Sequence, residues 1–176
     1  LLIDMNSKPL SVMITMNLMT AVAVLGSVGA GVISDKVFKG ARSPVAMRLY
    51  FIEATVISCA ALAMFSGLIK PGPLGVFLGG MSLVLTSLTV NSTHSIVGAA
   101  APMDIGGKKM AGFAAGLIDS FQYYGSALSL FLFGKMFAKY GWSAWYPLMV
   151  MFALSGGFCM FMVIRKQKRM KAQPGL

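Results

Sequence analysis

Charged residues are scarce in this sequence, and their scarcity argues against a soluble fold. Only 11% of the 176 residues are charged, and just five are acidic, whereas a typical soluble domain has roughly 25% charged residues. Hydrophobic residues make up 57% of the chain, and the mean hydropathy is +0.77. This composition excludes an ordinary soluble domain and predicts a protein that lies largely within a lipid bilayer.

Residues that carry catalysis or hold metals are also nearly missing. The two cysteines, Cys59 and Cys159, each lie inside an apolar block, without CxxC or any other metal-ligand spacing. Neither a disulfide nor a metal site is therefore expected. The sequence contains no nucleophile with a matching base and no glycine-rich nucleotide loop. We expect no enzymatic activity, no cofactor and no metal.

Long apolar blocks dominate what the sequence does contain. Each block reaches the roughly 20 residues that an α-helix needs to cross the hydrocarbon core. We therefore predict an all-α membrane protein whose five transmembrane helices cover about 10–33, 47–69, 74–101, 110–137 and 144–164. A basic tail follows at 165–176. Because Leu1 is not an initiator methionine, we expect that the start of the protein is missing.

The net charge of +10 is explained by membrane topology, and no nucleic-acid partner is expected. Basic residues concentrate in cytoplasmic loops of membrane proteins. Eleven of them fall in the first and third predicted loops and the tail: Lys36, Lys39, Arg42, Arg48, Lys108, Lys109, Arg165, Lys166, Lys168, Arg169 and Lys171. The opposite side has only Lys8, Lys70, Lys135 and Lys139. We therefore predict a multi-pass protein of the cell (inner) membrane, with residues 1–9 outside and the C-terminus in the cytoplasm.

The loop after the first predicted helix carries the most informative motif. Residues 31–42 read GVISDKVFKGAR, which resembles the G-x-x-S/A-D-x-x-G-R-R loop of the major facilitator superfamily. The SDK-x-F-x-G-x-R form is similar to that of the organophosphate:phosphate antiporters. Residues 107–116, GKKMAGFAAG, and 140–143, YGWS, resemble the start of helix 11 and the loop before helix 12 in the same family.

This resemblance implies both a fold and an activity. The five predicted spans would be helices 8 to 12 and would form most of the C-terminal six-helix bundle. The protein would exchange a small organic phosphate, such as a glycerol or hexose phosphate, for inorganic phosphate by alternating access. The expected phosphate-binding arginines belong to helices 1 and 7 of the family, so they would lie in the missing N-terminal portion.

The loop motif also suggests a conformational role for Gly31, Asp35 and Arg42. Gly31 has no side chain, so a neighbouring helix backbone could approach it closely. Asp35 could accept hydrogen bonds from the N-terminus of another helix, expected near Met110. The lysines of the loop are expected only to fix topology.

Two polar stripes within the spans are the candidates for a substrate pathway, because polar groups are costly in a bilayer. Ser87, Asn91 and His94 are spaced to share one helical face. Asp119, Gln122, Tyr123 and Ser126 form a similar stripe in the next span. Alternatively, His94 makes a single interhelical hydrogen bond and Asp119 a salt bridge between helices.

Glu53 is expected to have only a local role. It lies about two turns inside the second predicted span, near Arg48, so we expect its carboxylate to reach the interface or to pair locally.

Three functional hypotheses remain. The first is the organophosphate:phosphate antiporter. The second is another facilitator carrier that is coupled to protons through His94 or Asp119. The third is a sensor of a phosphorylated metabolite that keeps a transporter fold.

Overall fold

The computed structural model describes residues 9–67 and 72–172, and this part of the chain is helical, with no strand. Five α-helices follow one another, with a π-helix (η1) and a 3₁₀ helix (η2) at two junctions. They are α1 (Pro9–Lys36), α2 (Arg42–Phe65), α3 (Pro73–His94), η1 (Ser95–Ala100), α4 (Ala101–Tyr140), η2 (Gly141–Ala144) and α5 (Trp145–Ala172). The all-α prediction is confirmed. Residues 1–8 of the expected external segment and residues 70–71 of the turn after the second predicted span lie outside the described residues.

Four of the described helical segments are long and apolar enough to cross a membrane. They are Leu10–Lys36, Arg42–Phe65, Pro73–Ala100 and Trp145–Arg169. These segments support membrane integration. The fourth predicted span, 110–137, lies inside α4, which does not reach the same apolarity. Asp119, Gln122 and the two tyrosines that follow are the cause, because they interrupt its apolar run.

The second helix is displaced toward the N-terminus from its predicted position. It begins at Arg42 and ends at Phe65, whereas the sequence predicted 47–69. Pro44 fits in the first turn, where a backbone N–H has no partner within the helix. Gly67 then turns the chain with a φ of 73°. Glu53 consequently lies near the middle of this 24-residue helix, deeper than expected.

The chain remains helical from α3 into α4, where the sequence predicted a loop. Pro102 cannot donate a backbone hydrogen bond, and the turn before it widens into η1, where the N–H of Ala101 bonds to the carbonyl of Ile96. Gly107 then breaks the helical geometry with φ 57° and ψ −170°. Pro102 thus deforms the helix without ending it, whereas Gly107 interrupts it, and two helices meet there at a kink. At the far end of the chain, α5 continues to Ala172 instead of stopping at 164.

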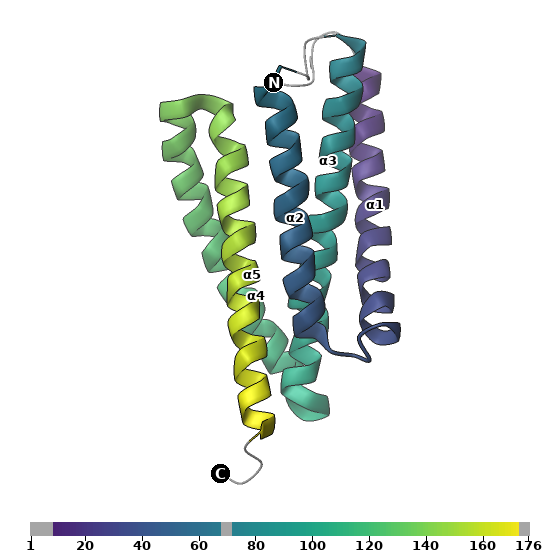
Figure 1. Ribbon diagram of the computed structural model, residues 1–176, viewed down its shortest axis with the longest axis vertical. Helices are drawn as coiled ribbons and strands as arrows, with labels where there is room; N and C mark the ends of the chain where they lie inside the picture. Colours follow the sequence, from purple (N-terminus) through teal and green to yellow (C-terminus); the bar gives the residue numbers. More distant parts are fainter. Residues whose placement is uncertain (1–8, 68–71, 173–176) are drawn as a thin grey trace.

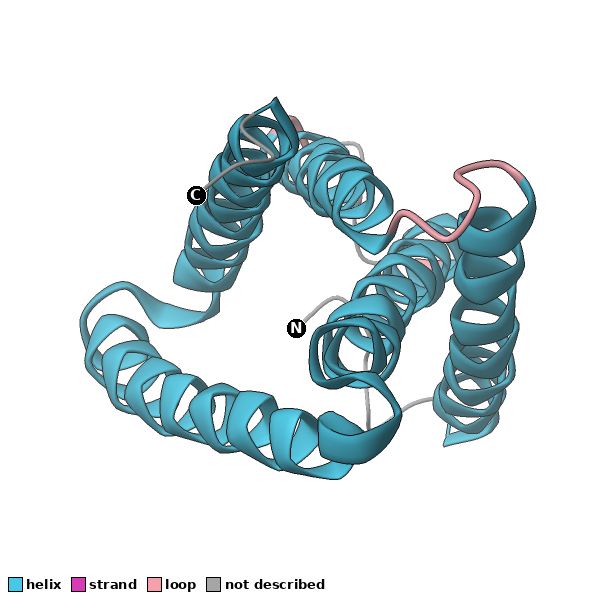
Figure 2. Cartoon of the chain, turned by 90° about the horizontal axis from the view of Figure 1, so that it is seen from below, coloured by secondary structure: helices cyan, strands magenta, loops and turns pink. Residues whose placement is uncertain are grey.

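Four of the helices form the packed part of the molecule. Helix α2 packs against α5 and α3, and α1 packs against α3 (Figure 1). Helix α4 runs along one side, from the end of α3 to the beginning of α5 (Figure 2). It contacts mainly η1 and η2 and touches α5 only slightly. In the rest of the article, "the packed group" means α1, α2, α3 and α5.

Glycine allows the closest approaches within the packed group. A Cβ atom on Gly26 of α1 would lie 2.7 Å from the Leu88 carbonyl oxygen of α3. A Cβ on Gly156 of α5 would lie 2.6 Å from the ring of Tyr50 in α2. Small residues at helix contacts are typical of membrane proteins, whose helices associate through close packing.

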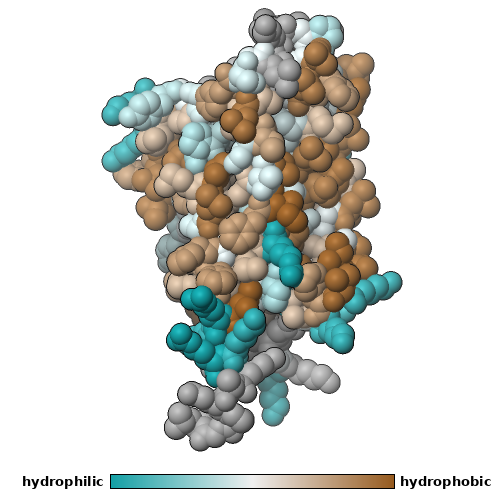
Figure 3. All heavy atoms as spheres, in the orientation of Figure 1, coloured by the Kyte–Doolittle hydropathy of each residue, from teal (hydrophilic) through white to brown (hydrophobic). Residues whose placement is uncertain are grey.

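Hydrophilic side chains gather mainly toward the two ends of the molecule, and apolar side chains surround its middle (Figure 3). The α1–α2 loop, the α3–α4 junction and the C-terminal end of α5 lie at the same end (Figure 1). These are the segments for which the sequence predicted a common, cytoplasmic side. Which side of the membrane this end faces stays a prediction.

Candidate functional site

A pocket between α3 and α4 brings together residues from both predicted polar stripes. His94 stands at the end of α3, and α4 contributes polar side chains from two successive turns of one face. The pocket has a volume of about 220 Å³ and is lined by His94, Asp119, Gln122, Tyr123 and Ser126. All four α4 residues of the predicted stripe therefore share one pocket with the histidine.

The π-helix positions the histidine against α4. A Cβ atom on Gly98 of η1 would lie 3.4 Å from Nε2 of Gln122 and 3.6 Å from Cε1 of His94. Both side chains thus lie against the η1 backbone at a position where glycine leaves room for them. Single π-helical turns within longer helices occur frequently at functional sites, and this one lies at the pocket wall.

The pocket offers both charge signs and several hydrogen-bonding groups. Gln122 is half-buried, whereas His94, Asp119 and Ser126 are exposed and Tyr123 is 77% exposed. Neither His94 nor Asp119 forms an ion pair with another residue of the described ranges. Asp119 therefore does not make the interhelical salt bridge considered as its alternative, at least within 9–67 and 72–172. The carboxylate and imidazole are left facing the pocket.

Ser87 and Asn91 do not join this pocket. The Ser87 hydroxyl donates to the Met19 carbonyl of α1 at 3.0 Å, and Asn91 Nδ2 donates to the Ser87 carbonyl at 2.8 Å. The Asn91 carbonyl in turn accepts from Ser27 of α1 at 3.3 Å. Ser87 and Asn91 therefore do not line this pocket with His94, and their part in a substrate pathway stays a prediction. The Ser87 hydroxyl and the Asn91 carbonyl join α3 to α1.

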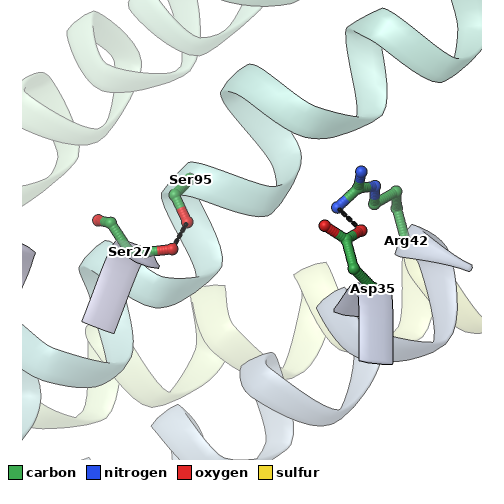
Figure 4. Close-up of polar contacts among 4 residues, drawn as sticks. All are labelled: Ser27, Asp35, Arg42 and Ser95. Atoms are coloured by element: carbon green, nitrogen blue, oxygen red, sulfur yellow. Dashed lines mark hydrogen bonds and ion pairs between the residues drawn. The ribbon is translucent and has the colours of Figure 1, made fainter. Parts of the chain in front are cut away.

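The polar contacts between α1 and α3 continue into the π-helix. Ser95 donates to the Ser27 carbonyl oxygen at 3.3 Å (Figure 4). Polar side chains therefore join α1 to α3 and η1 over several turns. In a bilayer, hydrogen bonds of this kind between helices stabilise their association.

The loop motif forms an ion pair within itself. Nη1 of Arg42 lies 3.1 Å from Oδ1 of Asp35, across the α1–α2 loop (Figure 4). The Asp35 side chain is 61% exposed. The kink at Gly107, where two helices meet within α4, places a helix start close to the expected Met110, and a contact of Asp35 with it stays a prediction.

Gly31 does not mark a close helix contact among the described residues. A Cβ atom placed on it would meet nothing within 4 Å. The predicted close approach occurs at Gly26, about one and a half turns earlier, because that part of α1 faces α3.

The burial of Glu53 in α2 differs from the expectation that its carboxylate reaches the interface. Glu53 is 7% exposed and Thr93 is 3% exposed, and α2 packs against α3. The sequence signal for this burial was the position of the Glu53 carboxylate inside an apolar block. It was discounted because the predicted helix began five residues too late, which placed Glu53 near an interface.

No cluster of three or more metal-ligating side chains occurs in the described part of the chain. The polar pocket between α3 and α4 is thus the feature with the most chemical capacity for a soluble ligand. The chain matches no protein-family model, no curated protein and no solved structure.

Proposed function

We propose that the chain is part of a secondary transporter that moves a small organic phosphate across a membrane by alternating access, in exchange for inorganic phosphate. In this proposal the five helices correspond to helices 8 to 12 of the major facilitator fold, and α4 crosses the membrane in addition to the four apolar segments. An N-terminal half would complete the substrate pathway. The exchange would take place in the cell (inner) membrane, with the C-terminus in the cytoplasm.

The observation that carries this proposal is the pocket between His94 and the polar face of α4. Polar groups in a membrane-spanning segment are costly unless they pair with one another or line a water-filled path. Asp119 and His94 have no ion-pair partner among the described residues, and Tyr123 is exposed. A polar helix face of this kind fits the wall of a transport pathway that another part of the protein closes.

The rest of α4 also supports the idea that another part of the protein covers the pocket. Its large apolar side chains Phe113, Phe121 and Leu128 are 67%, 70% and 61% exposed. Lipid suits these side chains but not the polar pocket beside them. In the proposal, lipid covers the apolar side of α4 and the N-terminal half faces the pocket.

The charges in the pocket suggest different tasks for this chain and for the N-terminal half of the transporter. An organic phosphate carries about two negative charges, and proteins recognise it with arginine side chains that donate paired hydrogen bonds. The pocket residues of this chain include one carboxylate and no arginine. This chain would therefore contact the hydroxyl groups of the organic moiety, and the other half would bind the phosphate group.

A second candidate, a proton-coupled facilitator carrier, is favoured by the same pair of residues. Histidine and carboxylate side chains form the proton relays of membrane transporters, and His94 and Asp119 share one pocket. Protons would then drive transport in place of phosphate exchange.

Counterflow separates these candidates. Proteoliposomes that contain the complete protein and internal unlabelled phosphate are given external labelled phosphate, with glycerol phosphate or hexose phosphates as competitors. We expect uptake that requires internal phosphate and falls with one of the competitors. Uptake that follows only an imposed pH gradient would favour the proton-coupled carrier. No uptake by folded protein under either condition would contradict both and favour a sensor.

A further inference from the structure

A groove between α2 and α5 is separate from the pocket and is not used by the proposed transport pathway. It has a volume of about 280 Å³ and is lined by α2 residues between Phe51 and Cys59 and by Val150 and Leu154 of α5. Phe51 is 43% exposed and Leu154 is 46% exposed, so the groove opens to the outside of the packed group. Both helices are long and apolar enough to span a membrane, which places the groove against the hydrocarbon of the bilayer.

Helical spacing brings a basic side chain to one end of this groove on α2. Arg48, Phe51, Thr55 and Cys59 follow one another at intervals of three or four residues, so they share one helical face. The Arg48 guanidinium carbon lies 4.5 Å from the centre of the Phe38 ring, and Phe38 belongs to the α1–α2 loop. Arg48 therefore extends from the groove toward the loop, as long basic side chains do at a membrane interface.

Helix α5 changes from apolar to basic along the face that borders the groove. Leu154, Phe161, Arg165 and Lys168 are separated by seven, four and three residues, so they too share one face. The Arg165 guanidinium carbon lies 4.6 Å from the centre of the Phe161 ring. Arg165 and Lys168 are both exposed, so their charges are open to a ligand at the end of this face.

The two arginines lie at the same end of the groove because α2 and α5 run antiparallel. Ala60 of α2 and Tyr146 of α5 belong to one buried cluster, whereas a Cβ atom on Gly156 would lie 2.6 Å from the Tyr50 ring. The beginning of α2 is therefore level with the C-terminal end of α5, and the α1–α2 loop lies at that end as well (Figure 1). Neither arginine forms an ion pair within the described ranges.

This combination fits a ligand that has both an apolar chain and an anionic head. The groove offers apolar side chains at the depth of the bilayer, and guanidinium groups donate charge-assisted hydrogen bonds to phosphate oxygens. An acidic protein segment would satisfy the arginines and leave the groove unfilled. Clusters of basic side chains next to a membrane span attract anionic lipids, and an anionic phospholipid matches the groove and the charges together.

We infer that α2 and α5 form a binding site for one anionic phospholipid, taken from the leaflet at the end of the α1–α2 loop. One acyl chain lies in the groove, and the phosphate accepts hydrogen bonds from Arg48 and Arg165. Lys168 adds positive charge beside the headgroup. The site requires only that both helices span a membrane, so it is independent of the transported substrate.

Native mass spectrometry of the complete, detergent-solubilised protein tests this site. Phosphatidylglycerol and phosphatidylcholine with the same acyl chains are titrated separately. We expect one phosphatidylglycerol to bind more tightly than phosphatidylcholine, and its affinity to fall about fivefold in Arg48→Gln and in Arg165→Gln. Because the two arginines come from different helices, misfolding of one variant leaves the other to decide. Equal affinities for the two lipids in the wild type would overturn the inference.

Two control variants distinguish a site from a general attraction of charge. Lys139 in the last turn of α4 also lies over an aromatic ring, with Nζ 5.0 Å from the centre of the Tyr140 ring, but at the other end of the molecule. Lys139→Gln should leave the affinity unchanged. Lys166 follows Arg165 on α5 but lies off the face that borders the groove, so Lys166→Gln should have a smaller effect than Arg165→Gln. An effect of either control as large as that of Arg165→Gln would overturn the site.

A substitution that fills the groove tests the position of the acyl chain. Thr55 is exposed, and its hydroxyl bonds to the Phe51 carbonyl of its own helix at 2.8 Å. Thr55→Phe should therefore weaken phosphatidylglycerol binding. The matched control is Thr20→Phe on α1, where an exposed hydroxyl bonds to the Met16 carbonyl of its own helix at 3.1 Å. Equal binding by these two variants would contradict a chain in the groove.

The same spectra report whether a second copy of the protein occupies the groove instead. A lipid-free dimer that Thr55→Phe dissociates would overturn the lipid site. Counterflow is a separate measurement: a protein that shows no exchange and still binds phosphatidylglycerol through Arg48 and Arg165 would contradict the proposed function and support the lipid site.

Discussion

The packed group and α4 differ in the partners of their polar side chains. In the packed group some hydroxyls bond to a neighbouring helix, as Ser87 does to Met19 and Ser27 does to Asn91, while others, such as Ser82, bond to their own helix. On α4, Ser120 and Ser129 bond only to carbonyls of their own helix, and Asp119 has no ion-pair partner among the described residues. Some polar residues of this chain therefore join helices, and others remain without a partner on another described helix. Burial and hydrogen-bond partners distinguish the two groups.

Packing differs between the two regions in the same way. Gly26 and Gly156 are in contact with neighbouring helices, whereas a Cβ on Gly112 or Gly116 of α4 would meet nothing within 4 Å. The packed group is stabilised by its own contacts, and α4 presents a face that other groups must cover. Substitutions in the first region should change stability, and substitutions in the second should change function.

The largest effect on stability is expected at Gly26. An alanine there would place its Cβ 2.7 Å from the Leu88 carbonyl oxygen, and overpacking of this kind costs about 1–3 kcal/mol. Gly29→Ala is the matched control in the same helix, because its Cβ would meet nothing within 4 Å. That control should be neutral or more stable, by up to about 1 kcal/mol from helix propensity.

Thermal unfolding of the detergent-solubilised variants measures this difference. Gly26→Ala should unfold at a lower temperature than Gly29→Ala. Equal midpoints would contradict the close α1–α3 contact that defines the packed group.

A smaller effect, now on function, is expected at Asp119. Asp119→Asn keeps the size of the side chain and removes its charge, so exchange should fall about tenfold, which corresponds to about 1.4 kcal/mol. Stability should not change, because the carboxylate has no ion-pair partner among the described residues. Ser120→Ala is the adjacent control, and its exposed hydroxyl bonds to the Gly116 carbonyl of its own helix.

Counterflow and thermal unfolding are measured on the same preparations of both variants. A loss of stability without a loss of exchange in Asp119→Asn would assign the carboxylate to structure and remove the contrast between α4 and the packed group.

The sequence predicted the helices better than it predicted their contacts. Apolar runs identify helices because a span needs a minimum length, and each of the five predicted spans overlaps a helix of the structure. Their ends were less predictable: the chain stays helical past Pro102 by widening one turn into η1, whereas Gly107 interrupts the helix inside the loop expected at 102–109.

The polar stripe on α4 was predictable from spacing alone, since all four of its members line one pocket. The stripe on α3 was not. Helical spacing places Ser87, Asn91 and His94 on one face, but it does not say which neighbour that face meets. The position of α1 gives the Ser87 hydroxyl a partner in the Met19 carbonyl, and the π-helix places His94 against α4. Both are tertiary features.

Ser87→Ala tests this division with the smallest expected effect. The substitution removes the 3.0 Å hydrogen bond to the Met19 carbonyl, and interhelical hydrogen bonds in membranes contribute about 0.6 kcal/mol on average. We therefore expect a slight loss of thermal stability and an unchanged exchange rate. Ser82→Ala on the same helix, whose hydroxyl bonds to the Gly79 carbonyl of α3 itself, should change neither. If Ser87→Ala instead slowed exchange at unchanged stability, Ser87 would belong to the substrate pathway after all, and the contrast between the packed group and α4 would have to be redrawn through the middle of α3.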